Sequence, residues 1–297
     1  MEALSALNAR LTRPLEIRLK RPVQKSYPHL QGLYLPARAT GLMRVQKVKT
    51  GARLTLDGAA LDSWRGLNPT EAYFALLEAW WLRASLEMVG ERGSRWAEGM
   101  QGDCLMLWQR VPKRGLKIDK RLDSSLPYWG LHNIALMELF GLMSIKPGRP
   151  QKDKGWTIAE LKRTEFGEAL VPLIAREFTT ERLLEELFAE DEGREAGGAK
   201  VFDRYRELAL PYFPEWRRSL RLPPVNEYRD GVFTFKVSLG SVWRRIAIPA
   251  KLTLADLSGA IQDAFDFDDD HLHCFTYPDR FGLSVSVNLH GRAAAQR

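Results

Sequence analysis

The stretch VFTFKVSLGSVWRRIAIPAKLTLADLSGAIQDAFDFD, residues 232–268, carries the clearest folding signals in the chain. From Phe233 to Leu239, apolar and polar residues alternate, a pattern that predicts a strand with one buried face. Gly240–Ser241 provides a two-residue turn, after which Val242–Ile248 returns as a second strand. The stretch therefore begins with a predicted antiparallel hairpin.

A helix is predicted directly after this hairpin. Thr253 caps it, Asp256 completes a capping box, and Leu252 and Leu257 flank the cap as a hydrophobic staple. Its apolar face comprises Leu254, Leu257, Ile261 and Phe265. The segment DFDDDHLHCFTYPDRFGLSVSVNLH supplies two more strands. We expect an antiparallel sheet covered on one side by a helix.

Three pieces of this region resemble the opening of a plasmid pRiA ORF-three-like domain, also known as insertion-sequence passenger TnpR-like. They are the strand before Trp243-Arg244-Arg245, the helix start Leu254–Leu257, and the Asp-His-Leu-His-x-Phe run from Asp270 to Phe275. Upstream, LNPTEAYFALLEAWW, RTEFGEAL and YFPEW are similar to segments that precede the domain in longer bacterial relatives. The resemblance implies one inherited architecture and a link to plasmids and insertion sequences, but no established activity.

The resemblance ends before the second half of the family domain. That half carries an Asp-x-Gly-Asp-x-Trp-like stretch, whereas nothing after Val287 matches it. We expect a truncated, frameshifted or naturally short domain. A half-sheet leaves an unpaired strand edge, which favours association.

The central region shows a different pattern. Asn68, Pro69 and Glu71 form a helix start with a capping box, followed by an aromatic-rich face typical of a buried helix. Further on, an apolar helix over 128–142, two short strands around a polar tip, and another helix resemble the later part of a winged-helix domain. The tip cations are Lys146, Arg149, Lys152 and Lys154.

These cations suit contact with phosphate, since Lys and Arg neutralise phosphate charge without reading sequence. The 128–142 helix is less suited to reading bases. A recognition helix needs an exposed polar face, and this one offers only His132, Asn133 and Glu138. We expect it to be a core helix, in a region that contacts phosphate, binds protein or serves as a scaffold.

The net charge of +7 is concentrated in the N-terminal segment, where residues 1–50 contain ten Lys and Arg against two Asp and Glu. Such a segment is typical of either a solvated surface or a polyanion-binding arm. Within it, the second set of candidate phosphate-binding residues is Arg13, Arg18, Lys20 and Arg21.

The one pattern resembling a metal site is Asp270, His271 and His273. In an extended segment the two histidines share a face, and a nearby Asp provides a third ligand. The alternative is that these residues organise a turn. Phosphate-loop, nucleophile-elbow and zincin motifs are absent from the sequence, so no catalytic residue and no cofactor is predicted.

The fold class predicted from these signals is α+β. The expected function is that of a bacterial, cytoplasmic, non-catalytic binding or accessory protein, with nucleic acid as its first partner and a protein partner or homodimer as another. A metal-dependent hydrolase is the alternative. Two distant cysteines and the lack of a membrane-spanning apolar run favour the cytoplasm. The expected divisions are a basic arm or irregular lead-in over 1–50, a mainly helical winged-helix-like region over 51–190, a linker with a connecting helix over 191–224, and the partial domain over 225–297.

Overall fold

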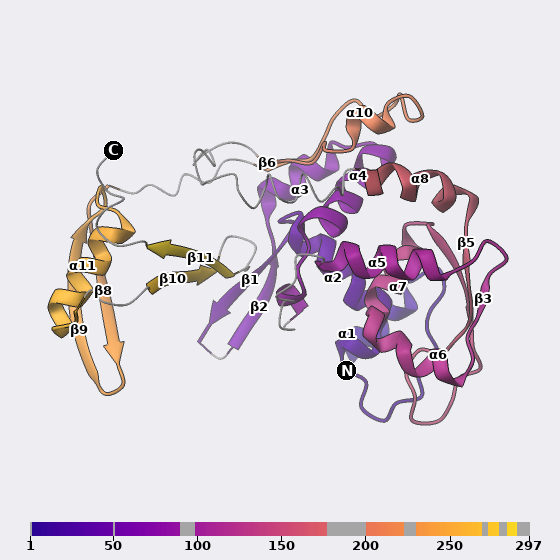
Figure 1. Cartoon of the computed structure of the whole chain (residues 1–297), viewed down its shortest axis with the longest axis horizontal. Helices are drawn as coiled ribbons and strands as arrows, with labels where there is room; N and C mark the ends of the chain where they lie inside the picture. Colours follow the sequence, from indigo (N-terminus) through magenta and orange to yellow (C-terminus); the bar gives the residue numbers. More distant parts are fainter. Residues whose placement is uncertain are drawn as a thin grey trace. The chain divides into compact units, whose positions relative to one another are not determined.

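The computed structural model describes residues 2–49, 51–89, 99–176, 200–222, 230–268, 273–278 and 284–289 (Figure 1). The chain divides into two compact units, each described by itself below. Unit 1 comprises residues 1–194 and 199–223, and unit 2 comprises residues 195–198 and 224–297. The fold class is α+β, as predicted, with many helices and small antiparallel sheets.

The N-terminal part of unit 1 is more ordered than an irregular lead-in. Its elements are α1 (Glu2–Ala9), η1 (Gln24–Ser26), α2 (Pro28–Ala39), the hairpin β1 (Met43–Val48) and β2 (Gly51–Leu56), and α3 (Gly58–Arg65). The expectation for residues 1–50 was therefore wrong over α2, whose Leu35 is fully buried. Pro28 is compatible with this helix because it occupies the first turn, where the helix needs no donor.

The predicted helix after Asn68 is present as α4 (Pro69–Glu78), which continues into a π-helical turn, η2 (Ala79–Arg83). The capping box is confirmed: the Asn68 side chain accepts from the backbone N–H of Glu71, and Glu71 accepts from that of Asn68. The aromatic face is buried, with Phe74 stacked on Trp216 at 4.2 Å between ring centroids. These helices thus form the centre of the core.

The second half of unit 1 begins after a short turn, η3 (Leu86–Val89). Its elements are α5 (Gly99–Arg110), β3 (Leu116–Lys117), α6 (Lys120–Ser125), η4 (Leu126–Trp129), α7 (Leu131–Leu139), β4 (Met143–Pro147), β5 (Ile158–Arg163) and α8 (Glu165–Arg176). The three strands form one antiparallel sheet in the order β3-β5-β4. Gly130, with φ of 74°, separates η4 from α7, so the helix predicted over 128–142 is shorter than expected.

Residues 200–222 close unit 1 with β6 (Lys200–Val201), α10 (Arg206–Ala209) and β7 (Arg221–Leu222), and β6 pairs with β7. This segment was expected to be a connecting helix that leads from a linker into the last domain. Instead, only Arg206–Ala209 is helical, and the segment belongs to unit 1, where Phe202, Tyr205 and Trp216 are each at most 1% exposed. Burial of such large aromatic side chains stabilises the attachment of the segment to the unit.

Two buried carboxylates fix this segment to α4. Glu71 accepts hydrogen bonds from the backbone N–H groups of Arg217 and Arg218, and Glu78 accepts one from that of Tyr205 at 2.9 Å. Each carboxylate side chain is 1% exposed. The backbone N–H groups of Tyr205, Arg217 and Arg218 therefore acquire acceptors that regular secondary structure does not provide.

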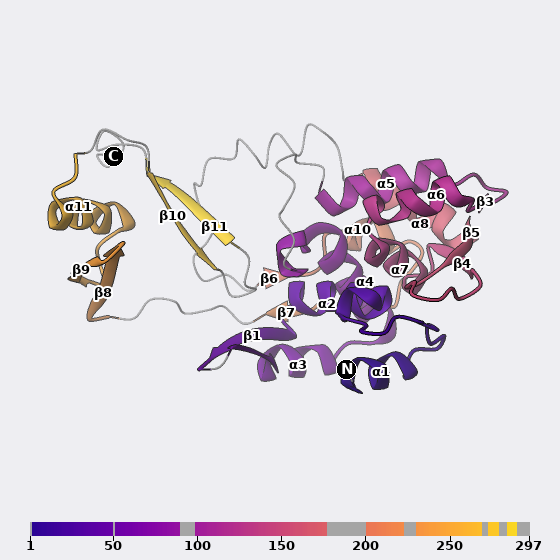
Figure 2. The same ribbon diagram turned by 90° about the horizontal axis from the view of Figure 1, so that it is seen from below.

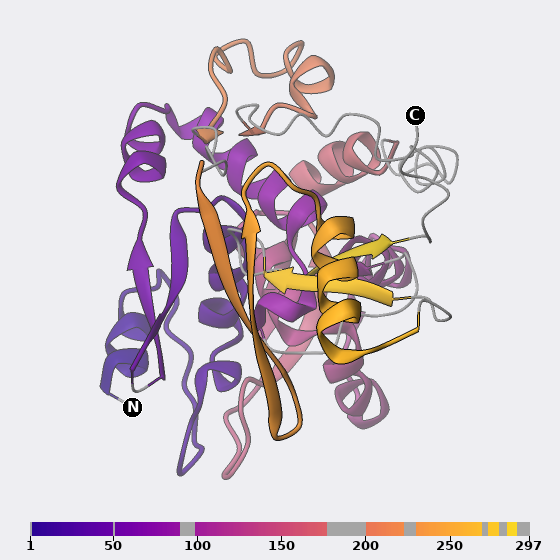
Figure 3. The ribbon, with the colours of Figure 1, turned by 90° about the vertical axis from the view of Figure 1, so that its left-hand side faces the viewer.

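Unit 2 contains β8 (Val232–Leu239), β9 (Val242–Pro249), α11 (Leu254–Phe265), β10 (His273–Pro278) and β11 (Ser284–Leu289). The predicted hairpin and the Thr253–Asp256 capping box are both confirmed. Helix α11 packs mainly on β9, where Ile246 and Ile248 contact Leu257 (Figure 3). In the described part of unit 2 the strands form two separate two-stranded sheets, β8-β9 and β10-β11, so the single predicted sheet is not formed. Helix α11, which was expected to cover this sheet, covers β9 and leaves Phe233 of β8 41% exposed.

Within the described residues, no helix has the length and apolar character needed to cross a bilayer.

Candidate nucleic-acid interface

The four tip cations lie on the hairpin formed by β4 and β5. Lys146 is on β4, and Arg149, Lys152 and Lys154 follow in the loop, all with exposed side chains. The loop closes through Gly148, whose backbone N–H donates to the carbonyl of Thr157 at 2.8 Å. Below it, Ile145 and Leu161 face inward as a buried cross-strand pair. The pleat of the strands therefore directs Lys146 to the opposite, outer face.

The arm cations lie on the segment between α1 and η1, here called the arm (residues 10–23). This segment begins after Asn8, whose side chain holds it by exchanging two hydrogen bonds with the backbone of Leu15, at 3.0 and 3.1 Å. The candidate residues Arg13, Arg18, Lys20 and Arg21 are all exposed. The arm is thus fixed at its start while its cations face solvent.

The structure brings the two predicted groups together. The backbone N–H of Asp153, at the hairpin tip, donates to the carbonyl of Arg18 in the arm at 3.2 Å. Both Figures 1 and 2 show the arm beside the β4–β5 loop. We name this surface the arm–tip surface; it comprises Arg13, Arg18, Lys20, Arg21, Lys146, Arg149, Lys152 and Lys154. Sequence reasoning identified its residues but gave no indication that the two groups are adjacent.

Few of these cations are neutralised within the protein. Arg18 pairs with Glu16 at 2.8 Å, Lys154 with Asp123 at 3.6 Å, and Arg13 reaches Glu138 at 3.9 Å. No ion pair within the described ranges involves the other five: Lys20, Arg21, Lys146, Arg149 and Lys152. The surface therefore retains positive charge for an external anion.

Further cations border the surface. The Lys154–Asp123 pair joins the hairpin tip to α6, whose first turn carries exposed Lys120 and Arg121. On the outer face of the sheet, Glu160 is the cross-strand partner of both Lys117 and Lys146. Lys117, Lys120 and Arg121 lie in a stretch with a small excess of basic residues, which is visible in the sequence. Their position beside the hairpin tip follows only from the fold.

Helix α7, which precedes this hairpin, is buried, as its apolar sequence predicted. Residues 132–137 are each at most 7% exposed, and α2 lies against the helix. The approach is close at Gly32 of α2, because a Cβ there would lie 2.9 Å from Cγ of Leu136 and 3.0 Å from the carbonyl oxygen of His132. Any direct contact of α7 with base edges would require α2 to move.

A polar contact fixes α2 on α7 and links both to the arm and the hairpin. The Nε2 atom of His29 on α2 lies 2.8 Å from Oε2 of Glu138 on α7. The His29 ring also meets Trp156 of the hairpin edge-on, at 4.9 Å between ring centroids. Since Arg13 approaches the other oxygen of Glu138, one carboxylate connects three parts of the site.

The alternative metal site is only partly within the described residues. Asp270 and His271 lie outside them, and His273 is the first residue of β10. Elsewhere in the described ranges, no group of three or more His, Cys, Asp or Glu side chains is positioned to hold a metal ion.

Comparison with known proteins finds one family model that matches the C-terminal region. The match covers residues 232–294, from β8 onward. No curated protein and no solved structure matches the chain. This match lies in the region where the sequence shows the resemblance: residues 232–294 are similar to the family described as plasmid pRiA4b ORF-3-like protein.

Proposed function

We propose that this chain is a non-catalytic accessory protein of the cytoplasm that contacts nucleic acid through the arm–tip surface. The observation that carries the proposal is the hydrogen bond between Asp153 and Arg18, which joins two exposed basic segments that are far apart in sequence. Together they offer phosphate oxygens several cations at once. The role of these side chains is to neutralise phosphate charge.

The order of elements in this half of unit 1 supports the same function. The succession α5, β3, α6, α7, β4 and β5, with sheet order β3-β5-β4, supports a winged-helix-like interpretation, in which the β4–β5 hairpin corresponds to the wing. A hairpin tip with exposed cations is suited to contact with the phosphate backbone of DNA. The basic tip therefore occupies the place where a winged-helix domain meets phosphate.

The packing of α7 limits what such an interface recognises. In a winged helix, α7 would be the recognition helix, yet here it is buried under α2. Base edges in the major groove are read by side chains that project from an exposed helix or ribbon. We therefore propose binding that depends on phosphate and salt, with little preference for base sequence.

The family match indicates the biological setting in which to test this function. Its printed description refers to a plasmid, which makes a role with mobile DNA the first biological setting to test.

The test is fluorescence anisotropy with labelled duplexes of unrelated sequence. The tip variant Lys146→Ala/Arg149→Ala/Lys152→Ala/Lys154→Ala should bind every duplex about tenfold or more weakly, because each cation that neutralises a phosphate adds a favourable, salt-dependent term to binding. The matched control removes four exposed cations elsewhere: Lys49→Ala/Arg53→Ala/Arg245→Ala/Lys251→Ala. An equal weakening in the two variants, or no binding by the unaltered protein at low salt, would refute the proposal.

A second candidate function is self-association through β8. Within the described residues β8 pairs only with β9, and Phe233 and Phe235 on it are 41% and 39% exposed. An unpaired strand edge next to apolar side chains favours addition of another strand. Light scattering should show a dimer that Phe233→Lys disrupts and Val232→Lys, on the opposite face, does not; a monomer at all concentrations excludes this candidate.

A further inference from the structure

The outer face of the β8–β9 hairpin in unit 2 combines an exposed aromatic ring with two cations. Ile246 and Ile248 of β9 pack against α11 on the inner face (Figure 2). Successive residues of a strand point to opposite faces, so Trp243 and Arg245 lie on the outer face, together with Lys236, the cross-strand partner of Arg245. All three of these outer residues are exposed.

The structure gives different roles to the two arginines that follow Trp243. The Nε atom of Arg244 donates to the carbonyl oxygen of Ala264 in α11 at 3.2 Å, and its guanidinium lies 5.5 Å from the centroid of the Phe265 ring. Arg245 projects from the other face, where its side chain has no partner among the residues that the structure describes. Arg244 thus fixes the helix to the hairpin, whereas Arg245 remains available to an external group.

The two outer cations are placed against each other. Lys236 and Arg245 are directly opposite in the register of the hairpin, an arrangement of like charges that destabilises a strand pair. No acidic residue lies nearby in sequence, since residues 231–255 contain four Lys and Arg and no Asp or Glu. An anion bound between the two side chains would remove their repulsion.

The aromatic ring lies directly beside these charges. Trp243 is 50% exposed, and Nζ of Lys236 lies 5.1 Å from the centroid of its ring. This cation–π contact holds the indole on the outer face before any ligand arrives. Bases of an unpaired strand stack on such rings, while Lys and Arg beside them neutralise the phosphates.

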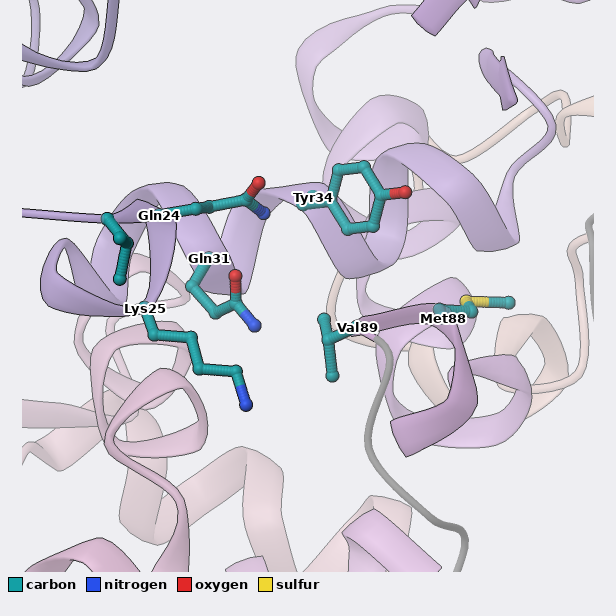
Figure 4. Close-up of a pocket in the computed structure, with 7 residues that line it drawn as sticks. Gln24, Lys25, Gln31, Tyr34, Met88 and Val89 are labelled. Atoms are coloured by element: carbon teal, nitrogen blue, oxygen red, sulfur yellow. The ribbon is translucent and has the colours of Figure 1, made fainter. Parts of the chain in front are cut away.

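The availability of these cations distinguishes the hairpin from the hollow lined by α2 and η3 in unit 1. Figure 4 shows Lys25 as the cation of that hollow, which is open to solvent. Lys25 already interacts within the chain. Lys236 and Arg245, by contrast, have no acidic partner in the described part of the chain.

We propose that the outer face of the β8–β9 hairpin binds single-stranded nucleic acid, with one base stacked on Trp243 and the adjacent phosphates neutralised by Lys236 and Arg245. The bases of an intact duplex are stacked on one another and do not reach the indole. This site belongs to unit 2 and does not depend on the arm–tip surface.

Fluorescence anisotropy with labelled thymidine and uridine homopolymers, about twelve nucleotides long, tests the proposal. The four-residue tip variant serves as the background, so that the binding measured does not come from the tip. It should bind at least one strand with a Kd of about 100 μM or tighter at low salt. Adding Trp243→Ala should weaken this binding about tenfold, because one stacked base has an effect of that size.

Two further substitutions separate stacking from a folding defect. Trp243→Phe retains a ring and should keep the affinity within about threefold. Phe233→Ala removes an exposed aromatic side chain from the inner face and should leave the affinity unchanged. Absence of binding to both strands, or equal affinities for the Trp243→Ala and Phe233→Ala variants, overturns the proposal, as does a loss in Trp243→Phe that equals the loss in Trp243→Ala.

The charges are tested by a salt series. Lys236→Ala/Arg245→Ala should lower the slope of log affinity against log salt by about 0.7 for each phosphate no longer neutralised. The control Lys49→Ala/Arg53→Ala removes two exposed cations of unit 1 and should keep the slope; equal slopes in the two variants overturn the proposal.

A duplex separates this proposal from that for the arm–tip surface. In the protein with an intact tip, Trp243→Ala should leave the affinity for a blunt-ended duplex unchanged, whereas the tip variant should lose it. Equal weakening of duplex and single-strand binding by Trp243→Ala would overturn the stacking role. Failure of duplex binding alone would contradict only the arm–tip surface.

Discussion

The backbone N–H of Asp153 donates to the carbonyl oxygen of Arg18 at 3.2 Å, which joins the tip of the β4–β5 hairpin to the arm. Asp153 has a φ of 58°, so it occupies the left-handed region that few side chains adopt. The turn thereby presents its N–H to the arm. Two segments with exposed cations become one surface, and their contributions to binding can be tested separately.

The arm should contribute to nucleic-acid binding as the tip does. In Arg18→Ala/Lys20→Ala/Arg21→Ala, we expect the slope of log affinity against log salt to fall by about one for each phosphate that the variant no longer neutralises. Anisotropy titrations over a salt series measure the slope. If the arm variant keeps the slope of the unaltered protein, the arm is not part of the interface.

Asp153→Gly should strengthen binding by a few-fold. Glycine accepts the positive φ without strain and keeps the N–H that bonds to Arg18, while the substitution removes a negative charge from a basic surface. The measurement is duplex affinity at low salt together with thermal stability. Weaker binding by a variant of undiminished stability would show that the Asp153 carboxylate has a positive role.

Gly32→Ala should destabilise unit 1 by about 1–3 kcal/mol. Its Cβ would lie within 3.0 Å of both the backbone of His132 and the Leu136 side chain, where α2 approaches α7. Gly58→Ala is the control, because a Cβ there meets nothing within 4 Å. Urea unfolding of both variants measures the difference, and equal stabilities would contradict the close packing of α2 on α7.

Glu78 should make stability depend on pH near neutrality. Burial raises the pKa of Glu78 to about 7, against the effect of its backbone hydrogen bonds and of Arg83. A folded-state pKa above the unfolded value of 4.5 means that the native state holds the extra proton, so the free energy of unfolding falls as pH rises from about 4.5 to about 7.

The total change attributable to Glu78 is on the order of 3 kcal/mol. Urea unfolding across this pH range should show that Glu78→Gln removes most of the dependence, because glutamine retains the acceptor for Tyr205 without titrating. Glu71 should have the opposite pH dependence, in the more acidic range below about pH 4.5. Burial raises the pKa of Glu71, but hydrogen bonds from the backbone of Asn68, Arg218 and Arg217 hold it below its usual value. Its contribution is present above the unfolded pKa and is lost as pH falls through the lower, folded one. A Glu78→Gln variant with an unchanged pH profile would contradict the assignment to Glu78.

Local signals in the sequence predicted local structure well. The capping boxes at Asn68 and Thr253 depend on residues three positions apart, and the β8–β9 turn depends on Gly240, whose φ is 57°. Each of these elements is specified by contacts within one turn of the chain. They were therefore predictable from spacing alone.

Tertiary contacts explain what the sequence did not predict. His29 meets Glu138 across 109 positions, and Tyr205 meets Glu78 across 127. No periodicity indicates that α2 covers α7 or that residues 200–222 join the core. The candidate cations were identified because charge is visible in sequence, but their union through Arg18 and Asp153 depends on this packing.

The most direct test of the central claim is the salt dependence of duplex binding by the unaltered protein and the four-residue tip variant. We predict binding that weakens steeply with salt, a smaller slope for the tip variant, and similar affinities for duplexes of unrelated sequence. Binding with the same slope in both proteins, or affinity confined to one sequence, would contradict a phosphate-contacting surface formed by the arm and the hairpin tip.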